Sequence, residues 1–324
     1  MTAVRIRDLV LEFTGTTTVR ALDGIDLEVA EGASLAIVGE SGSGKSTLAS
    51  VIGRLHPRSA RIVSGTLEVG GVDVLALDID GLRRYRRDTL AYIAQDPIGS
   101  LDPTMRIGRQ LQLVLRAMGE ETSTRRQIEL LDAMRIANSE RVIRLFPHQV
   151  SGGMAQRVAI AMAMCRAPKL LIADEPTAAL DSQVREEVVR LLFEQARAQG
   201  TTVLWLSHDL PAVARWCDEV AVMYAGRVVE RGPAQAVLGQ PVHPYSRALA
   251  ATDPSRARRG ERLASIPGAP PVLHGASAGC AFAPRCAARI DACTTTRPEP
   301  AATRHSLCIR TEEMRAQVRL EVSA

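Results

Sequence analysis

The 324-residue sequence has no apolar run long enough to cross a lipid bilayer. The longest candidate, residues 158–165, is far shorter than the roughly 20 apolar residues that a spanning helix needs. The first residues also lack the basic start, the apolar core and the small-residue cleavage site of a secretory signal. These two absences predict a protein that stays in the cytoplasm and does not itself span a membrane.

Lysine and aromatic residues are scarce. Only two of the 40 basic residues are lysines, Lys45 and Lys169, and aromatic residues make up 3% of the chain. The net charge is only +4. A nucleic-acid-binding surface usually clusters its basic residues, whereas these arginines are scattered and have few aromatic neighbours. We therefore expect no nucleic acid among the partners.

Short apolar runs alternate with helical patterns along the chain. Residues 34–38 lead into a glycine-rich turn and a helical stretch at 47–55, and the runs 170–173 and 203–206 each follow a helical stretch. Buried parallel strands produce such continuous apolar runs. Residues 183–199 have the spacing of an amphipathic packing helix. The pattern predicts an α/β fold.

The composition changes near residue 235. Before it, residues 220–230 predict a hairpin that turns at Gly226. After it come Pro254, several arginines and the proline-rich stretch 267–271, which indicate a linker or extended arm. A chain of this length accommodates one large and one small domain. We therefore predict domains at residues 1–235 and 236–324.

Residues 39–46, Gly-Glu-Ser-Gly-Ser-Gly-Lys-Ser, match the phosphate-loop pattern G-x-x-x-x-G-K-[ST] between a strand and a helix. The glycines let backbone N–H groups turn inward, and the dipole of the following helix adds positive potential for a polyphosphate. We expect Lys45 to reach the β and γ phosphates of ATP and Ser46 to offer its hydroxyl to Mg²⁺. The predicted nucleotide-binding residues of this loop are Gly39, Ser41, Gly42, Gly44, Lys45, Ser46 and Thr47.

The apolar run at 170–173 is followed by two carboxylates, Asp174 and Glu175. In a phosphate-loop ATPase, Asp174 would hold Mg²⁺ and Glu175 would polarise the attacking water. As a lone motif the pair is weak evidence, because many strands end in acidic residues. Its position downstream of a phosphate loop makes ATP hydrolysis the better interpretation.

Residues 150–157, Val-Ser-Gly-Gly-Met-Ala-Gln-Arg, lie between these motifs and resemble the signature sequence of ABC ATPases. Ser151, Gly152 and Gly153 would present a hydroxyl and N–H groups at a helix start, which is a second anion site. In the ABC family, the phosphate bound there belongs to the ATP of a partner subunit. The resemblance therefore implies two ATPase subunits that meet head to tail with nucleotide between them.

The remaining ABC motifs follow in the family's order. A lone histidine or aromatic is often only structural, so these assignments depend on the resemblance. It implies an ABC-type P-loop nucleotide-binding domain of the α/β class, with a RecA-like core, an antiparallel β subdomain and a helical signature subdomain. The implied residues are Gln95 in the Q-loop, also a Mg²⁺ ligand, Ala179 to Asp181 in the D-loop, His208 as the switch histidine and Phe13 against adenine.

Three stretches resemble the oligopeptide, dipeptide and nickel importer branch of the family. The first is the sequence that follows the Q-loop, at 95–103, and the second is the His-Pro-Tyr segment at 243–249, which opens the C-terminal extension of these importers. The third is the set of methionines Met154, Met162 and Met164, which resembles that of a D-type subunit. The resemblance implies an F-type second ATPase subunit, two transmembrane permeases and an extracytoplasmic substrate-binding protein, with this chain peripheral on the cytoplasmic face of the membrane.

Other kinds of ABC protein remain as alternatives. They are a cytosolic ABC protein of translation or DNA repair, an exporter subunit, and an importer of nickel or another non-peptide solute. We find no internal repeat in the sequence, whereas translation-type members usually carry two nucleotide domains in one chain. Exporters generally lack the His-Pro-Tyr segment. Peptide import is therefore the favoured interpretation.

Six cysteines fall into two groups. Two are isolated among apolar residues and are expected to be core thiols, namely Cys165 and Cys217. In a cytoplasmic protein, four clustered thiols favour a metal centre over disulfides. The importer resemblance implies a [4Fe–4S] cluster for these four; zinc and a metal-free cluster remain open. The four are Cys280, Cys286, Cys293 and Cys308.

Overall fold

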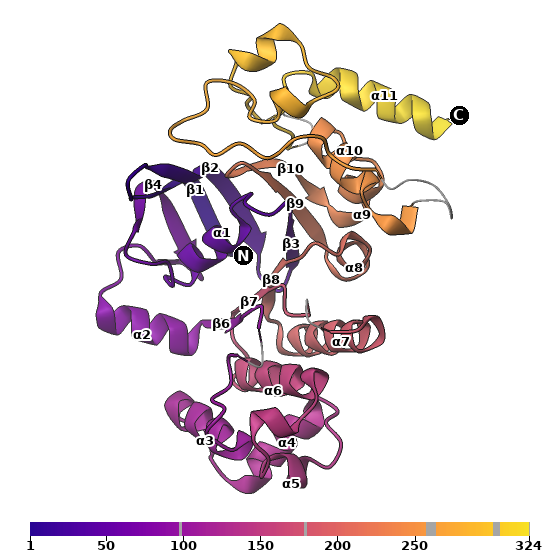
Figure 1. Ribbon diagram of the computed structural model, residues 1–324. Coiled ribbons are helices and arrows are strands. Elements are labelled where there is room, and N and C mark those ends of the chain that lie inside the picture. Colours follow the sequence, from indigo (N-terminus) through magenta and orange to yellow (C-terminus); the bar gives the residue numbers. More distant parts are fainter. Residues whose placement is uncertain (97–98, 178–179, 257–263, 301–304, 324) are drawn as a thin grey trace. The chain divides into compact units, whose positions relative to one another are not determined.

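The computed structural model describes residues 1–324 except 97–98, 178–179, 257–263, 301–304 and 324 (Figure 1). It divides into two compact units. We call residues 1–3, 29–33 and 70–205 the signature unit, and residues 4–28, 34–69 and 206–324 the phosphate-loop unit. The predicted domain division at residue 235 stays a prediction.

An antiparallel sheet in the phosphate-loop unit has the strand order β2-β1-β4. Buried and exposed residues alternate along much of β1, as a sheet with one solvated face requires. The pairing of β1 with β4 sets Phe13 opposite Ala60. The strands are β1 (Thr2–Phe13), β2 (Val19–Ala30) and β4 (Ala60–Val69).

Three further strands of this unit have the order β10-β9-β3. β3 is buried along its whole length and pairs in parallel with β9, which confirms the strand predicted at 34–38. The predicted hairpin is also confirmed, because Ala225 and Gly226 both take positive φ, 45° and 75°, in a two-residue turn. The strands are β3 (Ser34–Val38), β9 (Glu219–Tyr224) and β10 (Arg227–Pro233).

Most helices of the phosphate-loop unit have eight residues or fewer. The helix after the phosphate loop begins at Lys45 and ends at Ile52, earlier than the predicted span 47–55, because Gly53 caps it. Cys217, which follows α8, is buried, as expected of a core thiol. The helices are α1 (Lys45–Ile52), α8 (Leu210–Trp216), α9 (Ala234–Gly239), α10 (Pro244–Ala251) and α11 (Thr311–Ser323), with 3₁₀ turns η2 (Pro254–Arg256), η3 (Ala283–Arg285) and η4 (Asp291–Thr294).

Parallel strands form the centre of the signature unit, in the order β8-β7-β6. Every residue of β7 and β8 is buried, and these two strands confirm the strands predicted at 170–173 and 203–206. β6 and β7 pair so that Tyr92 lies opposite Ile172. The strands are β6 (Leu90–Ile93), β7 (Leu170–Asp174) and β8 (Thr202–Leu206), with the short β5 (Val72–Asp73) elsewhere in the unit.

The helix predicted at 183–199 is α7, and it buries the face that the spacing indicated, including Val188, Leu192 and Ala196. Its Phe193 meets Trp205 edge to face at 5.3 Å. Cys165 is buried beyond α6, as expected. The helices are α2 (Ile79–Asp88), α3 (Ile107–Met118), α4 (Thr124–Ala133), α5 (Ser139–Val142), η1 (Pro147–Gln149), α6 (Gly152–Met164) and α7 (Ser182–Gln199).

No helix within the described ranges has both the length and the apolar character needed to cross a membrane.

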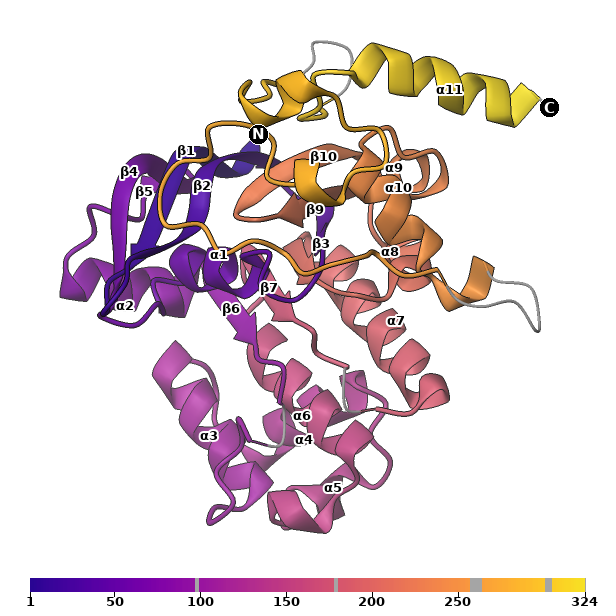
Figure 2. The ribbon, with the colours of Figure 1, turned by 45° about the horizontal axis from the view of Figure 1, so that its top comes forward.

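The chain after residue 235 stays within the phosphate-loop unit. We call residues 236–324 the extension. Its segment from 264 to 279 has no helix or strand, and the later part of it lies beside β2 (Figure 2). There the backbone N–H of Arg20 donates to Leu273 O at 2.7 Å. Farther on, Leu307 N donates to Val229 O of β10 at 2.8 Å. The extension is therefore hydrogen-bonded to this unit at separate points.

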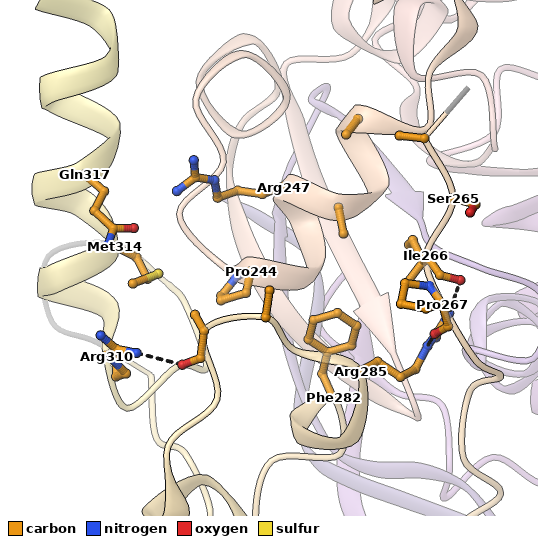
Figure 3. Close-up of a pocket in the computed structure, with 15 residues that line it drawn as sticks. Pro244, Arg247, Ser265, Ile266, Pro267, Phe282, Arg285, Arg310, Met314 and Gln317 are labelled. Carbon is orange, nitrogen blue, oxygen red and sulfur yellow. Dashed lines mark hydrogen bonds between the residues drawn. The ribbon is translucent and has the colours of Figure 1, made fainter. Parts of the chain in front are cut away.

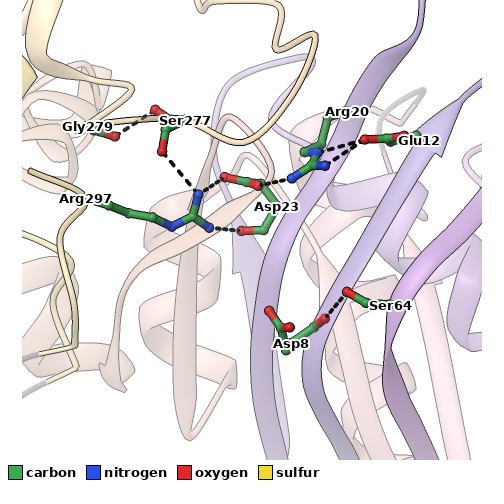
Figure 4. A network of polar contacts seen from close by, with 8 residues as sticks. All are labelled: Asp8, Glu12, Arg20, Asp23, Ser64, Ser277, Gly279 and Arg297. Carbon is green, nitrogen blue, oxygen red and sulfur yellow. Dashed lines mark hydrogen bonds and ion pairs between the residues drawn. The ribbon is translucent and has the colours of Figure 1, made fainter. Parts of the chain in front are cut away.

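Buried side chains join the extension to the same unit. Tyr245 and Phe282 pack with Tyr224 of β9 at ring-centroid distances of 4.5 and 5.3 Å. Arg297 binds the buried carboxylate of Asp23 at 2.8 Å, and Asp23 also pairs with Arg20 of β2 (Figure 4). The extension, poor in large apolar residues, thus completes its core with side chains of the ATPase fold.

Candidate nucleotide-binding site

Glycine shapes the phosphate loop. Gly39, Gly42 and Gly44 have φ of 153°, 78° and 102°, a region that favours glycine. A Cβ atom on Gly39 would lie 2.2 Å from the carbonyl oxygen of Met223, and one on Gly44 would lie 2.8 Å from that of Ala21. The loop can take this course only because these positions have no side chain.

Lys45 lies folded over the loop. Its side chain is largely buried, and Nζ donates to the carbonyl oxygens of Gly39 at 2.8 Å and Glu40 at 3.0 Å. Helix α1 starts here behind Gly44, which has no side chain to cap the helix. Ser46 is exposed and Thr47 half-buried in the first turn of α1, while Ser41 and Gly42 are exposed at the loop tip. The loop, a helix N-terminus and a lysine ammonium suit a bound polyphosphate.

Two other predicted site residues belong to the same unit. Phe13 is the half-buried last residue of β1. His208 is exposed between β8 and α8. The turn beyond it is built by Asp209, whose carboxylate accepts from Ala212 N at 3.0 Å and caps α8. The backbone around the imidazole is therefore fixed while the ring itself is exposed.

In the signature unit, Asp174 ends β7 and is largely buried. Its Oδ2 accepts a hydrogen bond from the hydroxyl of Tyr92 on β6 at 3.2 Å. Burial, and then the charge of Asp174, raise the pKa of Tyr92, so its hydroxyl stays protonated as a donor. Sequence patterns did not indicate Tyr92. The only signal was an aromatic residue in a short strand of otherwise aliphatic residues.

Glu175 follows directly and takes a left-handed backbone with φ of 44°. That conformation costs a non-glycine residue about 1–3 kcal/mol, and such strain clusters at functional sites. Its Oε2 accepts a hydrogen bond from Nε2 of Gln95 at 3.4 Å. The structure thus brings together two residues that lie 80 positions apart and that both come from predicted ABC motifs.

Residues 151–153 form the start of α6. Ser151 is exposed and caps the helix, since its Oγ accepts from Met154 N at 3.3 Å. A Cβ atom on Gly153 would lie 2.5 Å from Cγ1 of Val184, so glycine allows α6 to begin close to α7. Asp181 caps α7 by accepting from Val184 N at 3.1 Å. The predicted D-loop residue Ala179 lies outside the described residues.

The predicted site residues therefore fall into two sets, one in each unit. One set carries the phosphate loop and the other carries the acidic pair and the signature serine. The first set is Phe13, Gly39, Ser41, Gly42, Gly44, Lys45, Ser46, Thr47 and His208. The second set is Gln95, Ser151, Gly152, Gly153, Asp174, Glu175 and Asp181.

A metal centre is predicted at the four clustered cysteines. Cys280 and Cys293 are neighbours, because Cys280 N donates to Cys293 O at 2.8 Å. Yet among the described residues no three His, Cys, Asp or Glu side chains group as a metal ion requires. Burial and then nearby thiols raise the pKa of Cys308 to about 11. The structure does not support the predicted metal centre.

Comparisons with known proteins agree with these motifs. Residues 22–178 match the family model for ABC transporters, and residues 229–293 match that for the C-terminal region of oligopeptide and dipeptide transporters. The oligopeptide transport ATP-binding protein OppD of Escherichia coli K12 is 40% identical over 299 residues, covering 91% of this chain and 88% of that protein. The chain belongs to the ABC transporter family.

Other ABC proteins are similar as well. OppD of Salmonella typhimurium is also 40% identical over 299 residues, covering 91% of this chain and 89% of that protein. The solved dimer of the ATP-binding cassette MJ0796 bound to ADP and Pi has a TM-score of 0.63 and 28% identity, covering 71% of this chain and 98% of the cassette. The predicted α/β ABC fold is confirmed, and this chain is an ABC ATPase.

Proposed function

We propose that this chain is the ATP-hydrolysing subunit that powers an importer of peptides or related small solutes. One observation carries the proposal: an ABC cassette and the C-terminal region of oligopeptide and dipeptide transporters occur in the same chain. Relatives that resemble the chain over most of its length are named as oligopeptide transport ATP-binding proteins. Both comparisons favour peptides over the nickel, exporter and non-transport alternatives.

In the phosphate-loop unit, Lys45 and the glycine-rich backbone bind the phosphates of ATP. Lys45 leaves the carbonyl groups that it now contacts and binds the β and γ phosphates instead. Phe13 stacks on the adenine, and His208 donates to or orients groups around the γ-phosphate. The hydrogen-bonded turn that follows His208 supports this role, because it fixes the backbone that carries the exposed imidazole.

In the signature unit, Glu175 polarises the attacking water, and Gln95 holds the Glu175 carboxylate in place. Oxygen donors such as those of Gln95 and Asp174 suit Mg²⁺, which favours carboxylate, carbonyl and hydroxyl oxygens. Ser46, in the phosphate-loop unit, stays a predicted ligand of the same ion. When bound, this ion neutralises charge on the phosphates during transfer. The hydrogen bond from Tyr92 orients the Asp174 carboxylate for that purpose.

We infer further that the working form is a head-to-tail dimer with a second, F-type ATPase subunit. The exposed Ser151 at the start of α6 supports this, as does the dimeric assembly of the similar cassette. Ser151, Gly152 and Gly153 would contact the partner's ATP. A Ser151→Arg chain should then impair hydrolysis at the partner's site more than at its own, measured with each site inactivated in turn.

The proposed complex also contains two transmembrane permeases and a substrate-binding protein, with this chain peripheral on the cytoplasmic face of the membrane. The experiment is to reconstitute the chain and these partners in liposomes and measure ATP-driven peptide uptake. Uptake that requires MgATP and fails with Lys45→Ala supports the proposal. Co-purification with ribosomes or DNA instead of permeases would contradict it.

A [4Fe–4S] cluster at the four cysteines stays a prediction that depends on the family resemblance and the number of thiols. Thiol ligands would suit it only after a rearrangement and loss of their protons. Elemental analysis of anaerobically purified protein decides the matter. One cluster per chain would support the prediction. Absence of iron, with all four thiols alkylated under native conditions, would show that the region folds without it.

A further inference from the structure

Arg285 of the extension reaches the phosphate loop. Its Nη1 and Nη2 donate to the two carboxylate oxygens of Glu40 at 2.8 and 2.9 Å. The Arg285 side chain is 5% exposed and that of Glu40 is 25% exposed, so the pair is shielded from water. A two-pronged arginine–carboxylate pair fixes geometry as well as charge. Glu40 is the second residue of the loop that predicts phosphate binding.

The guanidinium of Arg285 is itself held on several sides. Its Nε donates to Pro267 O at 2.7 Å, and Nη2 donates to Ile266 O at 3.3 Å (Figure 3). Nη1 also donates to the hydroxyl of Tyr224 at 3.2 Å. Arg285 cannot turn away from Glu40 without breaking these bonds. Its position therefore depends on the folded extension.

A second residue of the extension holds the loop backbone. The hydroxyl of Tyr245 accepts a hydrogen bond from the N–H of Glu40 at 2.8 Å. The Tyr245 ring is fully buried and packs against Tyr224 and Phe282. Burial raises the pKa of Tyr245, so the hydroxyl stays neutral. The aromatic cluster thus aims one fixed acceptor at the phosphate loop.

These contacts meet at Glu40: Arg285 holds its side chain, and Tyr245 holds the peptide unit that joins Gly39 to Glu40. Its carbonyl accepts from Lys45 and its N–H donates to Tyr245. Gly39 has no side chain to restrict rotation, so the hydrogen bonds determine how this peptide is oriented. When Lys45 turns to a phosphate, its two carbonyl acceptors are released. The bond that Tyr245 accepts from Glu40 N and the pair between Arg285 and the Glu40 carboxylate then remain. Together with the bonds from Ser43 N to Glu40 O and from Gly226 N to Ser43 O, they keep the loop in shape.

We propose that Arg285 and Tyr245 are positioning residues for ATP, which hold the phosphate loop in its phosphate-accepting shape. The extension is then a working part of the nucleotide site. This inference rests on the proposed ATPase function. It goes beyond that function, because it assigns a role in ATP binding to residues about 200 positions or more after the loop.

The test measures MgATP binding to the full-length chain by titration calorimetry. Arg285→Gln should weaken binding about 10-fold, and Tyr245→Phe, which removes one hydroxyl and keeps the ring, about 3-fold. Arg310→Gln is the matched control, because Arg310 lines the same cavity of about 720 Å³ as Arg285 but bonds to Ala288 and Glu313. The control should stay within 2-fold of the wild type.

Two further readouts separate positioning from general damage to the fold. With the reconstituted partners, Arg285→Gln should raise KM for ATP and leave kcat within 2-fold, whereas a partly unfolded sample would lose kcat. The Glu40→Gln and Arg285→Gln changes should not add when combined, since either one breaks the same pair. Additive losses would mean that Arg285 does not act through Glu40.

The outcomes also distinguish this inference from the proposed function. If the wild-type chain does not bind MgATP, the proposed function fails. If the wild type binds and both Arg285→Gln and Tyr245→Phe bind within 2-fold of it, only the positioning inference is wrong. Tyr245→Phe keeps the test decisive if Arg285→Gln does not fold.

Discussion

The phosphate loop at 39–46 and the cysteine segment at 280–293 obtain their order in different ways. The loop follows a buried strand and runs into a helix, and its glycines are required by nearby backbone atoms. The cysteine segment contains only 3₁₀ turns, and its Arg285 is held by Tyr224 and Glu40 of the ATPase fold. A binding motif in the sequence therefore indicates where a ligand binds. The residues that hold the motif in its shape can lie in a distant part of the sequence.

The strongest way to separate the two regions is to disable the loop alone. Lys45→Ala should weaken MgATP binding at least ~100-fold, because charged hydrogen bonds to phosphate are lost from a preorganised site. Unfolding of the extension should not change. Lys169→Ala, at the exposed second lysine, is the matched control and should bind normally. Calorimetric titration checks this. Tight MgATP binding by the Lys45→Ala variant would contradict the assignment of Lys45 to the nucleotide site.

Glu175→Gln tests hydrolysis apart from binding. We expect kcat to fall about 100-fold while MgATP affinity stays within 3-fold, because the amide cannot polarise water but still fits. Steady-state phosphate release from the reconstituted complex is the measurement. Near-normal turnover would contradict the assignment of Glu175. Normal MgATP binding by this variant would show that binding of ATP and its hydrolysis depend on different residues.

Asp23→Asn breaks an anchor of the extension without touching the loop. The Asp23 carboxylate is buried and pairs with Arg20 and Arg297, so its loss should cost about 2–3 kcal/mol of unfolding free energy. Denaturant unfolding checks the value. Asp80→Asn, in an exposed pair with Arg83, should change stability by about 0.5 kcal/mol or less. Equal losses of unfolding free energy in the two variants would contradict the claim that Asp23 anchors the extension.

His243 should make the extension sensitive to acid. Burial lowers the pKa of His243 from 6.5 to about 4. Above pH 6.5, His243 is neutral in both the folded and the unfolded state, and its burial causes no loss of stability. As the pH falls from 6.5 towards 4, His243 gains a proton only in the unfolded state, so the free energy of unfolding decreases. At pH 5 the loss is about 2 kcal/mol. His243→Asn, which can still cap α10, should flatten this dependence in thermal unfolding. An unchanged pH profile would contradict it.

The sequence predicted the elements whose signals are local. The buried strands β3 and β7 and helix α7 were all found from short apolar runs or helical spacing, and the phosphate loop from its spacing of glycines. The ABC family followed from motif order. These features depend on neighbouring residues, so a single sequence contains them.

What the sequence did not predict are contacts between distant positions. Nothing near Arg285 or Tyr245 indicates that they meet Glu40, because they lie 245 and 205 positions from it. The strain at Glu175 and the hydrogen bond from Tyr92 to Asp174 likewise appear only after folding. The number of clustered cysteines and the importer resemblance suggested a metal as a source of order. The structure shows aromatic packing and ion pairs that hold this region, which the sequence did not indicate.

Hydrogen–deuterium exchange of the full-length chain, with and without MgATP, tests most directly whether the loop and the extension form one nucleotide site. Because coupling between sites is reciprocal, ATP that is held by a loop anchored to Arg285 must also stabilise the anchor. We predict slower exchange on MgATP binding both in peptides covering residues 39–46 and in those covering 280–286. Protection confined to 39–46, with exchange at 280–286 unchanged, would contradict this account.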